Sequence, residues 1–250
     1  MEPLTRMVVP FMLVLGRVSG FVAALPLFGW PSIPLRIRAG LALVLAIVFA
    51  SVLPVDAALG EAAWPTVALM VVREVLTGAA LGVAVAVLYA TVRQAGMIVT
   101  RQMGLAVAQE IDPVSGEPSQ PVGHLMETCF TILFLSAGGH RLLLRLMARS
   151  WDAWPVGQWP DLGVAAEAVL QASLAMLTFS LKLAAPMVAA FLVLAVVLAI
   201  LARILPEMNI LMASLPLRIG LGLFMAAALL PSLEGFTTEL GQWIDRVLIP

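Results

Sequence analysis

Charged residues are scarce in this 250-residue chain. Only 12% of its residues are Asp, Glu, Lys or Arg, 7% are aromatic, and 62% are hydrophobic. A soluble globular domain is about one quarter charged and about half apolar. The composition therefore excludes a disordered chain and a disulfide framework. It predicts an α-helical membrane protein, or a chain whose surface is covered by other subunits.

The chain also lacks the charge and the motifs of several other protein classes. Its 14 basic and 15 acidic residues leave a net charge of −1, so no positive field attracts nucleic acid. The single cysteine, Cys129, cannot form a disulfide within the chain. No Gly-rich phosphate loop, G-x-S-x-G elbow or metal-spaced set of His and Cys is present. We therefore expect no cofactor, no metal site and no enzymatic activity.

Hydrophobic residues gather into seven segments. In chain order these are Met7–Trp30, Ala39–Leu53, Thr66–Thr91, Met97–Ala108, His124–Gly139, Ala165–Leu201 and Ile210–Leu233. A helix that crosses a bilayer by itself needs about 20 apolar residues, and several segments are shorter. Short or broken helices are tolerated at membrane depth when protein buries them. The sequence predicts an all-α membrane protein of packed helical hairpins, with residues 1–250 forming a single domain.

Two of these segments carry expectations about where the chain turns. Ala165–Leu201 is long enough to cross twice, and Lys182 and Pro186 near its middle predict a hairpin there. Met97–Ala108 is set apart from the preceding segment, and the alternation of basic and acidic connections along the chain holds only if Met97–Ala108 also crosses or re-enters the membrane.

The connections between segments carry two further signals. Gly138 and Gly139 predict the end of a helix. The polar connection from Ser150 to Gly163 contains three tryptophans, which suit a membrane interface or the surface of another subunit. They are Trp151, Trp154 and Trp159.

Small residues recur at every fourth position on two predicted helices, which lets helix backbones approach closely. One set is Gly78, Gly82, Ala86 and Ala90, and the other is Gly16, Gly20 and Ala24. Packing within the chain and docking of a neighbouring subunit explain this spacing equally well.

Charged residues inside the apolar segments are costly and usually face the protein interior. They include Arg17, Arg73, Glu74 and Arg218. Neighbouring helical residues point about 100° apart, so we expect Arg73 and Glu74 to find partners elsewhere in the molecule. We favour a structural ion pair over a proton relay, because a relay needs more carboxylates than these segments hold. Arg17 and Arg218 are expected to bind backbone carbonyls or lipid phosphates.

The turn-rich segment Glu110–Gly123 (EIDPVSGEPSQPVG) joins two short apolar segments. A solvated connector is one interpretation, since loops usually lie at the surface. A loop that lines a cavity or plugs a pore is the other.

Five stretches of the chain resemble one known family, in order and over nearly the whole length. They are RVSGFVAALPLFGWPSIPLRIRAGLAL, REVLTGAALGVAVAVLYATVRQAG, TRQMGLAVAQEIDPVSG, FLSAGGHRLLL and ARILPEMNILMASLPLRIGLGLF. Together they resemble the FliR family of flagellar export-gate subunits of type III secretion. The homologous family of virulence injectisomes is the close rival.

The resemblance implies a non-enzymatic subunit of a bacterial inner-membrane export gate in the flagellar basal body. Its implied partners are the P-type and Q-type gate subunits, the B-type switch subunit, exported flagellar proteins and membrane lipid, with no nucleic acid. It also implies that the helical hairpins pack into a hetero-oligomeric helical assembly.

In the family, the loop that follows the QMG block plugs the closed pore. The matching residues here are Val107, Glu110, Ile111, Asp112, Pro113, Gly116, Pro118 and Pro121. Family members often carry aromatic residues before the Asp-Pro pair, where this chain has Val107, Glu110 and Ile111 instead. The resemblance therefore implies a less hydrophobic plug, whose seal depends on residues of partner subunits.

Two other functions are weighed against export. A proton-coupled small-solute transporter would need several convergent carboxylates, and Glu74 is nearly alone. An intramembrane enzyme is least favoured, because its motifs are missing.

Overall fold

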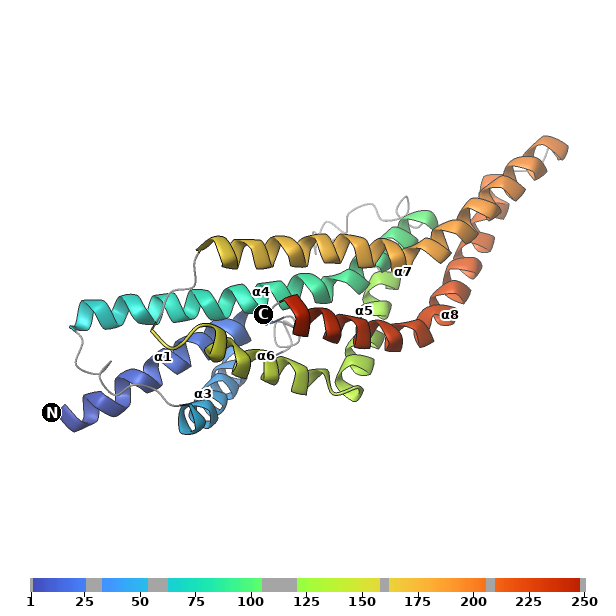
Figure 1. The fold of residues 1–250 in the computed structure, drawn as a ribbon. Coiled ribbons are helices and arrows are strands. Elements are labelled where there is room, and N and C mark those ends of the chain that lie inside the picture. Colours follow the sequence, from blue (N-terminus) through green and yellow to red (C-terminus); the bar gives the residue numbers. More distant parts are fainter. Residues whose placement is uncertain are drawn as a thin grey trace. The chain divides into compact units, whose positions relative to one another are not determined.

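The computed structural model describes residues 2–25, 33–53, 63–104, 121–157, 162–205 and 210–247, and every regular element in them is a helix (Figure 1). The helices are α1 (Glu2–Ala24), α3 (Leu35–Val52), α4 (Trp64–Gln102), α5 (Pro121–Ser136), α6 (Gly139–Ala153), α7 (Leu162–Ile204) and α8 (Ile210–Val247). This confirms the predicted all-α class.

Three of the described helices are long and apolar enough to cross a membrane. They are Leu35–Val52, Trp64–Gln102 and Ala166–Ile204, with mean hydropathies of 2.0, 2.1 and 2.8 over their most apolar stretches. The number rises to five if each of two bent helix pairs forms one broken span. The lengths agree with a membrane protein, since about 20 helical residues span the hydrocarbon core.

The predicted separation of Met97–Ala108 from the preceding segment is wrong over the described residues. Helix α4 runs without interruption through Gln102, and Arg93 and Gln94 lie inside it. Arg93 is exposed and Gln94 is half-buried. Polar side chains lower the local hydropathy, but they leave the backbone hydrogen bonds of a helix intact.

The predicted hairpin at Lys182 and Pro186 is also wrong, because α7 is one helix of 43 residues that contains Pro186. The charge near its middle is matched by a partner, since Lys182 Nζ lies 2.8 Å from Glu239 Oε1 of α8. Proline within a membrane helix is tolerated where neighbouring groups and local adjustments compensate for the lost hydrogen bond. A charge and a proline therefore did not require a turn here.

The helix end predicted at Gly138 and Gly139 is confirmed. Helix α5 ends at Ser136 and α6 begins at Gly139. Gly138 between them has φ of +85°, in the left-handed region. Glycine adopts this conformation without a Cβ penalty, which explains its place at the break.

The chain divides into two compact units. Unit 1 comprises Met1–Leu88, Gly138–Leu174 and Leu240–Pro250, and unit 2 comprises Tyr89–Ala137 and Ala175–Glu239. Helices α4, α7 and α8 each contribute to both units. The expectation that residues 1–250 form a single membrane domain stays a prediction.

Each unit has its own apolar core. In unit 1, Val9 and Leu13 of α1 pack with Val67 of α4, and all three are almost completely buried. Unit 2 contains an aromatic cluster of Tyr89, Phe130, Phe134, Phe179 and Phe236, with successive ring centroids between 5.2 and 6.4 Å apart. Tilted and edge-to-face pairs at such separations are favourable beyond the area they bury.

Candidate functional site

A buried ion pair joins α1 to α4 inside unit 1. Arg17 is 0% exposed and Glu74 is 1% exposed, and Arg17 Nε lies 2.6 Å from Glu74 Oε2. Glu74 therefore pairs with an arginine that lies 57 positions away in the sequence. An isolated charge at this depth would be very costly, and each side chain of the pair supplies the opposite charge beside the other.

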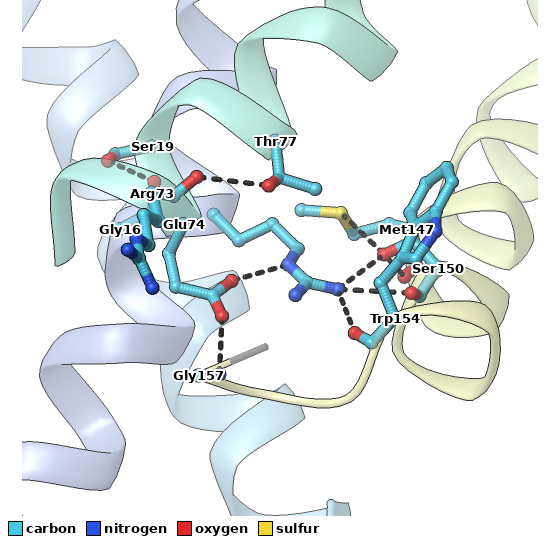
Figure 2. Close-up of polar contacts among 10 residues, drawn as sticks. Gly16, Ser19, Arg73, Glu74, Thr77, Met147, Ser150, Trp154 and Gly157 are labelled. Atoms are coloured by element: carbon cyan, nitrogen blue, oxygen red, sulfur yellow. Dashed lines mark hydrogen bonds and ion pairs between the residues drawn. The ribbon is translucent and has the colours of Figure 1, made fainter. Parts of the chain in front are cut away.

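The pair also binds the end of α6 and the turn that follows it (Figure 2). Arg17 Nη1 donates hydrogen bonds to the carbonyl oxygens of Ser150, at 3.0 Å, and Trp154, at 2.9 Å. The C-terminal end of a helix carries partial negative charge, which favours a cation there. On the other side, the Gly157 N–H donates to Glu74 Oε1 at 2.8 Å. The two side chains together connect α1, α4 and the C-terminal end of α6 with the turn that follows it.

Trp151 completes the surroundings of the guanidinium. Its ring centroid lies 5.4 Å from Arg17 Cζ, which is within cation–π range, and 4.8 Å from the Phe49 ring of α3. Trp151 is only 5% exposed. For this residue the expectation of a membrane-interface or intersubunit position is wrong, because its own chain buries it. Arg17 Nη2 is buried and has no hydrogen-bond partner among the described residues.

Glycines on both helices allow the ion pair to form. A Cβ at Gly78 would overlap the carbonyl oxygen of Arg17, and a Cβ at Gly20 would overlap that of Val75. A Cβ at Gly82 would lie 2.6 Å from the Cβ of Ala24. The structure thus places α1 against the Gly78–Gly82 part of the small-residue face. Such close approach puts the short Glu74 side chain within reach of Arg17.

The remaining residues singled out in the sequence lie elsewhere. Ala86 and Ala90 are half-buried on α4, and Arg218 is half-buried on α8 in unit 2. Arg73 is half-buried, and its carbonyl accepts a hydrogen bond from Thr77 Oγ1. Figure 2 shows the Arg73 side chain on the far side of Glu74 from Ser150.

Most of the predicted plug lies outside the described residues. This applies to Val107, Glu110, Ile111, Asp112, Pro113, Gly116 and Pro118. Pro121 is the first residue of α5, and the described chain before the segment ends at Gly104. The plug assignment therefore stays a prediction.

The geometry of the Arg17–Glu74 site favours a structural role. Both carboxylate oxygens of Glu74 are engaged, one by Arg17 and one by Gly157. A group that relays protons must exchange them with a neighbouring donor or with water. In the described ranges, no group of three or more His, Cys, Asp and Glu side chains is placed to hold a metal ion.

Sequence reasoning placed Arg17 and Glu74 at buried positions and expected Arg17 to bind backbone carbonyls or lipid phosphates, but it did not identify which backbone groups complete the site. Ser150, Trp154 and Gly157 contribute backbone groups, and a backbone carbonyl or N–H leaves no trace in residue identity. The one available signal was Arg17 itself, because a buried guanidinium has five N–H donors that require several acceptors.

Similarity to known proteins decides the family. The sequence model of the family described as bacterial export proteins, family 1, matches residues 8–242. The chain belongs to this family. The match includes Arg17, Glu74 and the whole segment from Gly104 to Gly123.

Individual relatives agree with this assignment. The chain is 30% identical to the flagellar biosynthetic protein FliR of Escherichia coli over 235 residues, which cover 93% of the chain and 88% of that protein. It is 31% identical to FliR of Bacillus subtilis, covering 86% of the chain and 83% of that protein. It is also 26% identical to the Yop proteins translocation protein T of Yersinia pestis, over 61% of the chain and 59% of that protein. These matches confirm the resemblance stated for the sequence.

Proposed function

We propose that this chain is the FliR-type subunit of a flagellar type III export gate, a non-enzymatic part of the channel through which unfolded flagellar proteins cross the inner membrane. The observation that carries the proposal is the similarity to FliR over 93% of the chain. The match to the Yersinia translocation protein covers a smaller share, which favours the flagellar over the injectisome system. The proposed location of this subunit is the flagellar basal body.

The exposed surface supports a role inside a membrane complex. On α3 and α7 many large apolar side chains are exposed, among them Val44, Ile47, Leu192 and Val193. Apolar surface on this scale is normally covered by lipid or by other subunits. The proposed neighbours are the P-type and Q-type gate subunits, with the B-type switch subunit and the exported flagellar proteins as further partners.

A proton-coupled transporter is the alternative, and the site geometry argues against it. Glu74 is the buried carboxylate on which that function would depend, and Arg17 and Gly157 already engage it. The two functions also differ in genetic context, because a gate subunit is expected beside other export-apparatus genes.

Affinity purification of the full-length chain in mild detergent, followed by mass spectrometry, tests the proposal. We expect the P-type and Q-type subunits to co-purify in one stable complex. A matched purification of an unrelated membrane protein of similar length controls for co-extraction. Recovery of the chain alone, or only as a homo-oligomer, would favour the transporter.

We also propose that the segment Gly104–Gly123 plugs the closed channel. Support comes from the position of this segment in the family match and from its prolines, glycines and carboxylates. Deleting Pro113–Pro121 is expected to make the assembled gate leak ions while assembly is largely retained. The measurement is the conductance of the purified complex in planar bilayers, beside the amount of complex recovered.

A substitution series controls for the loss of chain length. Replacing the same nine positions with a Gly/Ser linker keeps the length but removes the prolines and Glu117. Conductance at the wild-type level in both variants, with complex recovered, would contradict the plug.

A further inference from the structure

Helix α6 belongs to unit 1 and has two faces of opposite character. Its inner face is apolar, since Leu143, Leu146 and Met147 are at most 4% exposed. Its outer face carries three exposed arginines, which are Arg141, Arg145 and Arg149. Residues four positions apart lie about 40° apart around a helix, so these arginines fall within about 80° and along about 12 Å. Helix α6 is therefore an amphipathic helix with a basic outer face.

Positive charge is in excess on this outer face. Asp152, which is exposed at the end of the face, is the one acidic residue between Gly139 and Ala153. Among the described residues, no ion pair neutralises Arg141 or Arg145. The whole chain has a net charge of −1, so the excess is a local feature of α6. Leu144 is 40% exposed beside the arginines and adds apolar surface to the same face.

Contacts inside unit 1 fix the direction in which the basic face points. Arg17 Nη1 binds the carbonyl oxygens of Ser150 and Trp154 at the C-terminal end of α6 (Figure 2). The Trp151 ring packs against Phe49 of α3 at a centroid distance of 4.8 Å. Rotation of α6 about its axis would break these contacts, so the arginines stay on the outside of the unit.

The helix that α6 meets through Trp151 is suited to the acyl region of a bilayer. Helix α3 has a mean hydropathy of 2.0 and is only 11% buried, and its Val44 and Ile47 side chains are 58% and 54% exposed. Unit 1 thus presents an apolar helix of membrane length beside a basic amphipathic helix (Figure 1). Headgroups lie next to acyl chains in a bilayer, so this combination fits a lipid surface better than an acidic soluble protein.

We propose that the outer face of α6 binds the headgroups of anionic phospholipids at the membrane surface. Basic side chains near an anionic leaflet are attracted to its phosphates. The apolar face of α6 is already buried against its own chain, so charge and not insertion supplies the binding. The proposal goes beyond the export function and does not depend on it, because it uses only the charge and exposure of α6 and the apolar surface of α3.

The test uses the full-length chain, with any subunits that accompany it, in nanodiscs of about three parts phosphatidylcholine to one part phosphatidylglycerol. A fluorophore is attached through Ala148→Cys, an exposed position among the arginines, in a Cys129→Ser background. Quenching by spin-labelled phosphatidylglycerol, compared with spin-labelled phosphatidylcholine, gives the relative binding of the two headgroups at this face. Val44→Cys on α3 is the matched probe position.

At the Ala148→Cys probe, phosphatidylglycerol is expected to bind at least about fivefold better than phosphatidylcholine, because each basic residue near an anionic surface contributes about that factor. The Val44→Cys probe is expected to be quenched equally by both lipids. Raising the salt concentration from about 0.1 M to about 1 M shortens the Debye length from about 10 Å to about 3 Å and is expected to remove most of the preference. The salt series leaves every arginine in place, so it decides the question if a charge variant fails to fold.

Arg141→Gln/Arg145→Gln is expected to abolish the preference at the Ala148→Cys probe and to leave quenching by phosphatidylcholine unchanged. Arg93→Gln/Arg101→Gln is the matched control, because it removes two exposed arginines from α4 and changes the net charge equally. This control is expected to keep the preference.

Three results would overturn the proposal. Quenching at Val44→Cys with none by either lipid at Ala148→Cys would mean that protein or water covers the basic face. Equal quenching by the two lipids at Ala148→Cys would remove the selectivity for anionic headgroups. Equal loss of the preference in both arginine variants would trace it to the net charge of the chain. Co-purification of the P-type and Q-type subunits judges the export function separately from all three.

Discussion

Arg17 connects several separate parts of unit 1 through one side chain. Its side chain is fully buried and binds a carboxylate on α4, two carbonyls at the end of α6 and the face of Trp151. Replacing a buried ion pair with apolar residues is often tolerated, whereas removing one partner leaves the other charge uncompensated. The contribution of the pair to stability can therefore be measured by comparing variants that lack one partner with a variant in which both are replaced.

Arg17→Met is expected to lower the free energy of unfolding by about 3–5 kcal/mol, because it leaves the Glu74 carboxylate buried without its partner. The double variant Arg17→Met/Glu74→Leu is expected to lose less than the sum of the single variants. Unfolding by SDS in mild-detergent micelles provides the measurement.

Two further variants sharpen this test. Arg17→Lys keeps the charge but lacks the planar fork that reaches Ser150 and Trp154, so its stability is expected to fall between wild type and Arg17→Met. Arg36 is exposed on α3, so Arg36→Met serves as the control and is expected to change little. Additive losses in the double variant would contradict an energetic link between Arg17 and Glu74.

At the scale of elements, the crossing of α1 and α4 depends on glycine. The residues that approach most closely are Gly20 of α1 and Gly78 of α4, where an added Cβ would overlap backbone atoms of the other helix. Backbone atoms cannot move aside as the end of a flexible side chain can. The two helices would therefore have to separate, which would also strain the Arg17–Glu74 pair.

Gly20→Ala and Gly78→Ala are each expected to destabilise the chain by about 1–3 kcal/mol through overpacking. Gly40→Ala on α3 is the matched control, because a Cβ there meets nothing within 4 Å. It is expected to be neutral or to stabilise by up to about 1 kcal/mol through helix propensity. The same SDS unfolding assay compares the three variants, and a similar response in all of them would argue against close helix contact at Gly20 and Gly78.

Hydropathy described the positions of the helices better than their lengths. It separated Met97–Ala108 from the preceding segment because of Arg93 and Gln94, yet α4 continues through both. It placed a hairpin at Lys182 and Pro186, yet α7 continues and Lys182 pairs with Glu239. In each case the backbone hydrogen bonds follow local geometry, whereas hydropathy follows side-chain polarity alone.

At the scale of the whole molecule, the potential spans differ in how much of each the chain itself covers. The apolar stretch of α4 is 56% buried, against 28% for α7 and 11% for α3. Helix α4 is therefore the most buried of the three, while α3 and α7 expose most of their apolar stretches. A chain with such surface needs lipid or partner subunits, which is consistent with the proposed place in an export gate.

The amino-acid sequence by itself determined the class of the protein and the family to which it belongs. Low charge and long apolar segments are properties of composition, and composition decides whether a chain can remain in water. The break at Gly138 was also readable, because a left-handed residue is a local requirement that glycine meets.

Only the tertiary structure decided which buried groups meet. The pairing of Arg17 with Glu74 spans 57 positions, and its other partners are backbone atoms of Ser150, Trp154 and Gly157. The contact of Met103 with Gly222 joins residues more than 100 positions apart. Such contacts depend on which helix faces come together, and a single sequence records the type of each side chain but not its neighbours in space.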